Sequence, residues 1–215
     1  MDQEGISRAE YVYRRLREGI RDGSYRPGHR LREVQIAQEL ETSRTPVREA
    51  IRRLETDRLV EDVPGRGLSV TRLDEARVRE LYQFRTALEG AAAEMAALHA
   101  SEMDVATLAG TLVAMREAAD DAARAARLNR EFHRAIHAAA RNSFLTHAIE
   151  SMRDFMALLP GTTYQAPGRM EEVLREHDAV LRAIRDRASV RAGDAMRAHI
   201  QAAGQHRVQM VLAAC

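Results

Sequence analysis

The sequence predicts a mostly α-helical fold in two parts: three short helices with a β-hairpin, followed by a bundle of about six helices. Composition favours helix, because Ala, Leu, Glu and Arg dominate and only 4% of the 215 residues are aromatic. The apolar pattern also changes along the chain. Signals typical of strands end near residue 71, and only long helical patterns follow. We therefore expect one domain in residues 1–72 and a second in residues 73–215.

The first region opens with three helical patterns. Ser7 begins the capping-box sequence "SRAE", and apolar residues then recur at helical spacing until Gly23. A short second helix follows the turn "YRPGHRL". A third helix begins near "SRTP", where Ser43 or Thr45 can cap the first turn.

A hairpin is predicted directly after the third helix. Two β-prone runs, 59–63 and 68–70, flank the turn sequence "PGRG". Three helices followed by a two-stranded wing form the winged type of helix-turn-helix, in which the second helix of the pair enters the major groove of DNA. Residues 1–72 are therefore predicted to be a winged helix-turn-helix domain that binds double-stranded DNA.

The predicted third helix carries an arginine at every fourth position, at Arg44, Arg48 and Arg52. The opposite side holds the apolar residues Val47, Ile51 and Leu54. One side would therefore pack while the other presents guanidinium groups, which match guanine edges and phosphates. Arg66, at the tip of the wing, is placed to reach a phosphate or the minor groove. Taken alone, a row of arginines is more often a solvated helix face.

The stretch "PGHRLREVQIAQELETSRTPVREAIRRLETDRLVEDVPGRGLSV" resembles the GntR family of bacterial transcription regulators, and "SRTPVREAIRRL" is a highly specific part of it. The resemblance implies DNA contacts from the recognition helix and the wing, at Arg44, Thr45, Arg48, Arg66 and Gly67. The family usually has Gly and Val where this chain has Glu41 and Thr42. A glutamate in the left-handed turn that such a glycine serves costs about 1 kcal/mol.

Net charge does not indicate a polyanionic partner, since 33 basic residues, all of them Arg, are balanced by 32 acidic ones. The sole cysteine, Cys215, excludes a disulfide within the chain and indicates a reducing compartment. The sequence has no run of 18 apolar residues and no secretory leader. We expect a cytoplasmic protein with no membrane association.

The second region contains six helical patterns joined by short connections. They cover residues 74–100, 102–119, 121–141, 143–159, 169–187 and 189–213. The one long loop is "PGTTYQAPG", residues 160–168.

Polar residues interrupt the apolar stripes of four of these helices, at Arg85, Asn129, His133, His177 and His199. A single histidine in such a stripe is most often an ordinary core residue. Three histidines on separate inward faces also fit a divalent transition metal, because bundle cores are where such sites are built. Spacing alone does not show that the three rings meet, so both interpretations stay open.

The pieces "LYQFRTALE", "NREFHRAIHAAARN", "REHDAVLRAI" and "AMRAHI" resemble the FCD ligand-binding domain of the FadR subfamily, over about residues 75–212. The resemblance implies that Asn129, His133, His177 and His199 bind a metal, often zinc or nickel. It also implies that Arg85 meets the carboxylate of a small effector.

Other polar residues of this region are interpreted as structural. His137, His147 and His206 are expected to line a pocket or to lie at the surface, and Asn142 to cap the next helix. No well-placed Glu or Asp base is evident in the apolar stripes.

An amide at position 129 has an electrostatic consequence. Three neutral imidazoles and an amide leave the charge of a divalent ion uncompensated, and Arg85 adds further positive charge. We therefore expect a carboxylate effector that bridges the metal and Arg85, and a weaker effector-free metal site than an Asp would give.

Three functions fit these features. The first is a homodimeric repressor whose affinity for a pseudo-palindromic operator changes when a small organic acid binds the helical domain. A metal sensor, in which the ion itself is the signal, is the second. The third is a metalloenzyme with open coordination positions for water, but an enzyme would leave the winged domain unexplained.

Overall fold

The computed structural model describes residues 5–213, so Cys215 lies outside the described residues. The chain forms two compact units. The first, which we call the reading head, runs to Leu73 and also includes residues 153–159. The second, the helical domain, contains residues 74–152 and continues from Pro160. The expected boundary after residue 72 did not predict that residues 153–159 also belong to the first unit.

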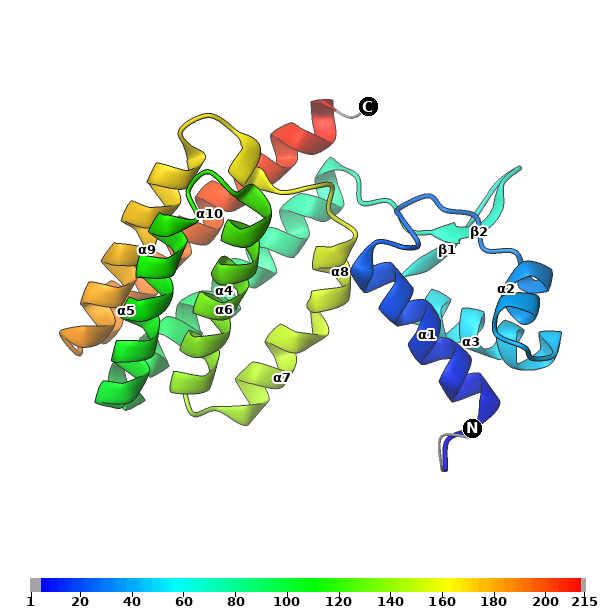
Figure 1. The fold of residues 1–215 in the computed structure, drawn as a ribbon, viewed down its shortest axis with the longest axis horizontal. Helices are drawn as coiled ribbons and strands as arrows, with labels where there is room; N and C mark the ends of the chain where they lie inside the picture. The colour runs from blue at the N-terminus through cyan, green and yellow to red at the C-terminus, as the bar shows by residue number, and fades with distance from the viewer. Residues whose placement is uncertain (1–4, 214–215) are drawn as a thin grey trace. The chain divides into compact units, whose positions relative to one another are not determined.

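The reading head has the expected order of three helices and a hairpin (Figure 1). Its elements are α1 (Arg8–Asp22), α2 (Glu33–Glu39), α3 (Arg44–Thr56), β1 (Val60–Val63) and β2 (Gly67–Val70). Ser7 caps α1 by accepting a hydrogen bond from the amide of Glu10, and Gly23 ends the helix in a left-handed conformation. The strands pair antiparallel, from Val60 opposite Val70 to Val63 opposite Gly67.

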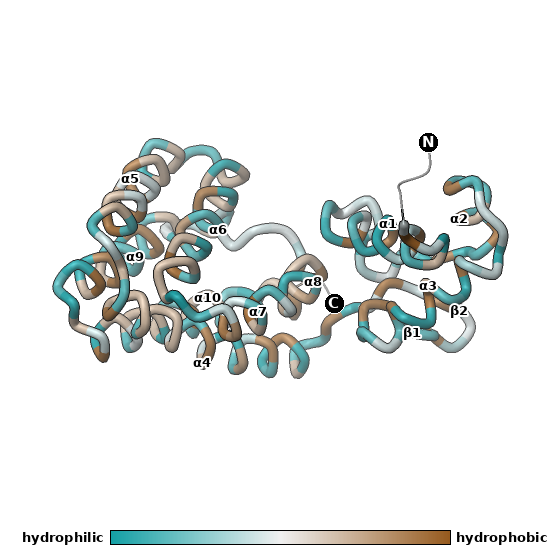
Figure 2. Tube along the Cα trace, turned by 90° about the horizontal axis from the view of Figure 1, so that it is seen from below, coloured by the Kyte–Doolittle hydropathy of each residue, from teal (hydrophilic) through white to brown (hydrophobic). Residues whose placement is uncertain are grey.

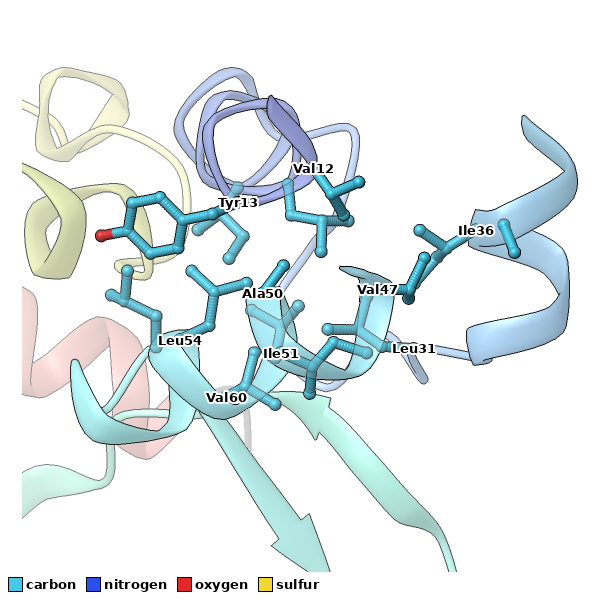
Figure 3. Close-up of a cluster of buried hydrophobic side chains, with 14 of the residues drawn as sticks. Val12, Tyr13, Leu31, Ile36, Val47, Ala50, Ile51, Leu54 and Val60 are labelled. Carbon is cyan, nitrogen blue, oxygen red and sulfur yellow. The ribbon is translucent and has the colours of Figure 1, made fainter. Parts of the chain in front are cut away.

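A single apolar core holds the reading head together. Side chains from the three helices, β1 and the segment between α1 and α2 point toward one another in Figure 3. The labelled ones are Val12, Tyr13, Leu31, Ile36, Val47, Ala50, Ile51, Leu54 and Val60. Burial of each large aliphatic side chain stabilises the fold by about 2 kcal/mol. The apolar side of the third helix thus packs as its period predicted, which turns its arginines outward.

Helix α8 (Arg153–Ala157) packs within the reading head. Leu158, directly after it, belongs to the same apolar core. Asp154 is buried and accepts hydrogen bonds from Arg17, at 2.7 Å, and from Arg21. The single helix expected over residues 143–159 was therefore wrong. It is divided at Met152, because the second half makes its contacts in a different unit from the first.

The helical domain is built from six further helices. They are α4 (Glu75–His99), α5 (Glu102–Glu117), α6 (Ala122–Ala139), α7 (Ser143–Ser151), α9 (Arg169–Arg185) and α10 (Ser189–Ala213). Apolar and polar residues are interspersed along the traces of these helices in Figure 2, and they separate clearly into two sides in α6, α7 and α9. Asn142 caps α7 by accepting from the amide of Leu145, as predicted.

Helices α4 and α10 pack closely along much of their length. Four alanines of α4 are fully buried: Ala92, Ala93, Ala96 and Ala97. A Cβ atom on Gly204 would lie 3.0 Å from the ring of Tyr82, so glycine allows the two backbones to approach. The dense alanine of residues 91–100 therefore serves close helix packing.

The long loop contains a short 3₁₀ helix, η1 (Thr163–Gln165), that packs against α6, α9 and α10. Gly168 adopts a left-handed conformation, with φ 73°, at the start of α9. No helix within residues 5–213 is both long and apolar enough to cross a membrane.

Candidate metal centre and nucleic-acid interface

Three histidines from three helices meet inside the helical domain. His133 lies on α6, His177 on α9 and His199 on α10, and each is at most 4% exposed. One nitrogen of each ring lies within 4.8 Å of the others. The Nε2 atom of His199 is 3.3 Å from Nε2 of His133 and 3.3 Å from Nε2 of His177. The structure thus brings together the rings that sequence spacing left apart.

Two carboxylates hold the outer nitrogens of two of these rings. Glu89 Oε2, on α4, lies 2.9 Å from Nδ1 of His133, and Glu176 Oε2, on α9, lies 2.6 Å from Nδ1 of His199. Burial favours the protonated form of Glu89, yet its bonds with His133 and His137 and the charge of Arg85 hold its pKa well below the usual range. Burial acts likewise on Glu176, and the bonds from His199 and Arg169 lower its pKa to about 2.

Both glutamates are therefore ionised at neutral pH and can only accept hydrogen bonds. The hydrogen in each bond then belongs to Nδ1 of the histidine. Burial keeps the rings neutral, because it lowers the pKa of His133 to about 4 and also lowers the pKa of His199. A neutral ring with its hydrogen on Nδ1 carries a lone pair on Nε2.

The Nε2 atoms of His133 and His199 thus face each other, 3.3 Å apart, with lone pairs on both. Two facing lone pairs at this distance repel unless a cation lies among them. Neutral imidazoles are also the form that binds a transition metal. The third ring, His177, stacks on Phe132 at 4.3 Å between centroids, and burial keeps its pKa well below normal.

Asn129 lies one turn before His133 on α6, where i and i+4 side chains share a face. Its Oδ1 atom is buried and has no hydrogen-bond partner among the described residues. A buried amide oxygen without a partner costs about 1–3 kcal/mol. Such an oxygen is a suitable ligand for a cation, so the residues expected to bind a metal fit one.

A second cluster shares His133 with the first. It consists of Glu89, His133 and His137, whose ligand atoms also lie within 4.8 Å of one another. Here hydrogen bonds already satisfy the atoms, since Glu89 Oε2 lies 2.9 Å from His133 Nδ1 and 2.8 Å from His137 Nε2. The three Nε2 atoms are therefore the better metal site, and His137 supports Glu89 from beside it.

Arg85 lies beside this cluster, with its side chain 12% exposed. Its Nε atom donates to Glu89 Oε1 at 3.2 Å. Arg169, 1% exposed, donates two hydrogen bonds to Glu176, at 2.8 and 3.1 Å. Two guanidinium groups therefore match the two carboxylates in charge.

The sequence interpretation missed both carboxylates. The charge balance that omitted Glu89 and Glu176 was wrong. Both carboxylates contact the outer Nδ1 atoms of the rings, so they do not contradict the expectation that no catalytic base is evident in the stripes. Glu89 directly follows Leu88 and lies four residues after Arg85, a spacing at which helix side chains meet. That spacing was the available signal, but glutamate on a helix is usually solvated.

In the reading head, the arginines of α3 lie on its exposed face. Glu33 of α2 bonds to two of them, with 2.9 Å from Arg44 Nη2 and 2.8 Å from Arg48 Nε. Thr45 and Arg52 are also exposed. The residues predicted to contact DNA thus share an accessible surface, and their contacts with DNA stay a prediction.

The wing presents Arg66, exposed at its turn, beside Gly67 with φ 74°. Between α2 and α3, Glu41 adopts the left-handed conformation expected there, with φ 48°. The turn thus keeps its shape without glycine, at a cost of about 1 kcal/mol.

Two family models match the chain. Residues 8–70 match the family described as "Bacterial regulatory proteins, gntR family", and residues 80–202 match the FCD domain. The matches fall in the reading head and the helical domain respectively. Regulators of the first family bind DNA and typically dimerise.

Related proteins have the same organisation. An uncharacterized HTH-type regulator, YdhC of Bacillus subtilis, is 29% identical over 197 residues, which is 90% of this chain and 88% of that protein. A probable D-xylose utilization operon transcriptional repressor of Paenarthrobacter nicotinovorans is 33% identical over 172 residues, covering 77% and 73% of the two chains. These relatives are transcriptional regulators and not enzymes.

Solved structures share the fold. Escherichia coli McbR/YncC superposes with a TM-score of 0.74 at 23% identity, covering 96% of this chain and 99% of that one. A GntR transcriptional regulator from Rhodococcus sp. RHA1 gives 0.71 at 25% identity, covering 98% and 100%. This chain is a member of the gntR family of bacterial regulatory proteins, with an FCD domain as its C-terminal part.

Proposed function

We propose that this regulator is a cytoplasmic, homodimeric repressor whose operator binding changes when a small carboxylate acid binds, together with a divalent metal, at the histidine cluster. One observation carries the proposal: the Nε2 atoms of His133, His177 and His199 converge, while ionised glutamates occupy Nδ1 of two of the rings. The relative named as a probable D-xylose utilization operon repressor supports repression as the mode of regulation.

The residues that would hold the metal are the three histidines and Asn129. A bound divalent ion supplies a positive centre with positions open to a carboxylate. Imidazole nitrogens are suitable ligands for zinc and nickel, the two ions that we propose.

Charge balance supports an acid as the effector. Arg85 and Arg169 offset Glu89 and Glu176, and the four proposed ligands are neutral. Glu172 also pairs with Arg169, but its side chain is 46% exposed, so water screens its charge. A divalent ion therefore leaves an excess of two positive charges in a buried place, which is costly without an anion. Arg85 is the guanidinium placed to share that anion with the metal, because its bond to Glu89 sets it next to His133.

Ligand screening by thermal shift tests the acid. Purified protein is heated with a panel of small organic acids, with and without zinc. We expect at least one acid to raise the melting temperature only when zinc is present, since ligands stabilise the state that they bind. Arg85→Gln should remove that shift. Arg79→Gln, on the same helix in an exposed pair with Glu75, serves as the matched control.

Binding to the DNA upstream of its own gene tests the regulation. DNase footprinting at moderate salt should show two protected half-sites, and the acid found by screening should change the protection. Absence of any protection would overturn the repressor proposal. Release by zinc alone, with no acid, would instead identify a metal sensor.

Asn129→Asp tests the charge argument directly. A carboxylate at this position supplies negative charge that the amide lacks, so acid-free zinc affinity should rise at least tenfold. Unchanged affinity would mean that charge does not limit the metal site.

A further inference from the structure

We propose that Glu89 and Glu176 are positioning residues, which fix the hydrogens of His133 and His199 on Nδ1 so that both Nε2 lone pairs point at one place. The inference rests on the proposed metal site but concerns the protein's own hydrogen bonds, which exist before any metal binds.

Two chains of hydrogen bonds end at the histidine cluster. In the first, Arg85 Nε donates to Glu89 Oε1 at 3.2 Å, and Glu89 Oε2 accepts from His133 Nδ1 at 2.9 Å. His137 Nε2 lies 2.8 Å from the same Oε2 atom. Glu89 is 2% exposed, so water does not compete for these bonds.

The second chain of hydrogen bonds also runs from arginine to glutamate to histidine, but on helices α9 and α10. Arg169 holds both oxygens of Glu176, at 2.8 and 3.1 Å, and Glu176 Oε2 accepts from His199 Nδ1 at 2.6 Å. Arg169 is 1% exposed. In each chain an arginine fixes the carboxylate and the carboxylate fixes the imidazole.

The arginines keep the carboxylates ionised, which makes them acceptors only. An imidazole facing such an acceptor must carry its hydrogen on Nδ1, and its Nε2 atom is left free to bind a metal. The opposite tautomer would set a carboxylate against a lone pair and point an N–H bond into the cluster. The two series of hydrogen bonds therefore orient His133 and His199 for metal binding before the ion arrives.

His177 provides an internal contrast. Its Nδ1 atom is buried and has no hydrogen-bond partner among residues 5–213. No carboxylate fixes its tautomer, and its ring is oriented by stacking on Phe132. Positioning by carboxylates thus applies to His133 and His199 but not to His177.

Nuclear magnetic resonance of the metal-free full chain tests the inference without metal. Long-range ¹H–¹⁵N spectra of the imidazoles at pH 7.5 distinguish a protonated nitrogen from one with a lone pair. We expect His133 and His199 to be protonated on Nδ1 alone. In Glu89→Gln, His133 but not His199 should become a tautomer mixture, and in Glu176→Gln, His199 but not His133, because an amide both donates and accepts.

Zinc titration gives the second readout. Each substitution should lower zinc affinity by about 10–100-fold, as loss of a partner to a metal-bound histidine usually does. The matched control is Glu94→Gln, on the same helix as Glu89, which removes an ion pair with Arg197 and touches no histidine of the cluster. It should stay within twofold of the original protein.

The outcomes separate the two proposals. Protonation of His133 and His199 on Nε2 in the metal-free protein would overturn the positioning role, whatever the metal does. Zinc affinities of the Glu89→Gln and Glu176→Gln variants equal to the Glu94→Gln control would overturn it as well. Nδ1 protonation in a protein that binds neither zinc nor nickel would support positioning and overturn the metal proposal.

Discussion

Two sets of arginine–glutamate pairs, one in each unit, differ in exposure, and the difference indicates two uses of the same chemistry. In the reading head, Arg44 and Arg48 share Glu33, and their side chains are 56% and 54% exposed. In the helical domain, Arg85 and Arg169 pair with Glu89 and Glu176 with side chains 12% and 1% exposed. Exposed pairs are worth at most about 1 kcal/mol, whereas breaking a buried pair costs about 3–5 kcal/mol.

Exposed guanidinium groups can therefore exchange a carboxylate for a phosphate at little cost, which suits contact with DNA. Buried ones hold their partners in place, which suits a site that must be arranged before its ligand arrives.

The largest effect is expected from removal of a buried partner. Arg169→Met leaves the Glu176 carboxylate without its bidentate partner, so the helical domain should lose about 3 kcal/mol of stability in urea denaturation. Arg191→Met, which breaks a pair of exposed side chains with Asp186, should cost less than about 0.5 kcal/mol. Equal losses in the two variants would remove the distinction between buried and exposed pairs.

Acid should destabilise the helical domain through its buried histidines. The pKa of His133 in the folded protein, about 4, lies below its ordinary value of 6.5. Between these values the unfolded chain binds more protons, so stability falls as pH drops from 6.5 towards 4, by at most roughly 1.4 kcal/mol for each pH unit.

Glu176 extends this loss to lower pH. Its folded pKa of about 2 lies below the ordinary 4.5, so the stability that it contributes is complete above pH 4.5 and disappears as pH falls towards 2. Circular dichroism melts between pH 7.5 and about 2 would show both trends. In Glu176→Gln the loss below pH 4.5 should shrink, and an unchanged profile would contradict the assignment.

Backbone strain should matter more than exposed ion pairs in the reading head. Glu41 has φ 48°, a conformation that glycine adopts without steric cost. Glu41→Gly should therefore raise the stability of the reading head by up to about 1 kcal/mol. A urea series that shows a loss instead would mean that the side chain makes a compensating contact.

The smallest effect on stability is expected for Glu33→Gln, under about 0.5 kcal/mol. The substitution frees Arg44 and Arg48 and removes a negative charge that would repel phosphate, so affinity for non-specific duplex DNA should rise a few-fold. Fluorescence anisotropy at several salt concentrations measures this change. Glu75→Gln, in a surface pair of the helical domain, should leave DNA affinity unaltered.

Local sequence signals predicted most of the fold. Ser7, Gly23 and Asn142 mark helix ends through bonds between near neighbours, and the stripe of α3 follows from its period. The break at Met152 could not be predicted in this way, because α8 is positioned by contacts with Arg17 and other residues distant in sequence. Helical periodicity does not record which unit a segment joins.

The residues of the candidate site also differ in whether the sequence alone could identify them. Histidines inside apolar stripes are conspicuous, so His133, His177 and His199 were found. Glu89 and Glu176 were missed because glutamate on a helix looks solvated until the opposite helices are in place. Their partners, His133 and His199, lie 44 and 23 residues away, beyond the reach of a local pattern.

Metal content measures the central claim most directly. Metal-stripped protein is titrated with zinc by calorimetry, and X-ray absorption of the loaded protein identifies the ligands. We predict one ion per chain bound by three imidazoles, lost in His199→Ala and kept in His147→Ala, which alters an exposed histidine. Absence of zinc and nickel binding, or affinity unchanged in His199→Ala, would contradict the account.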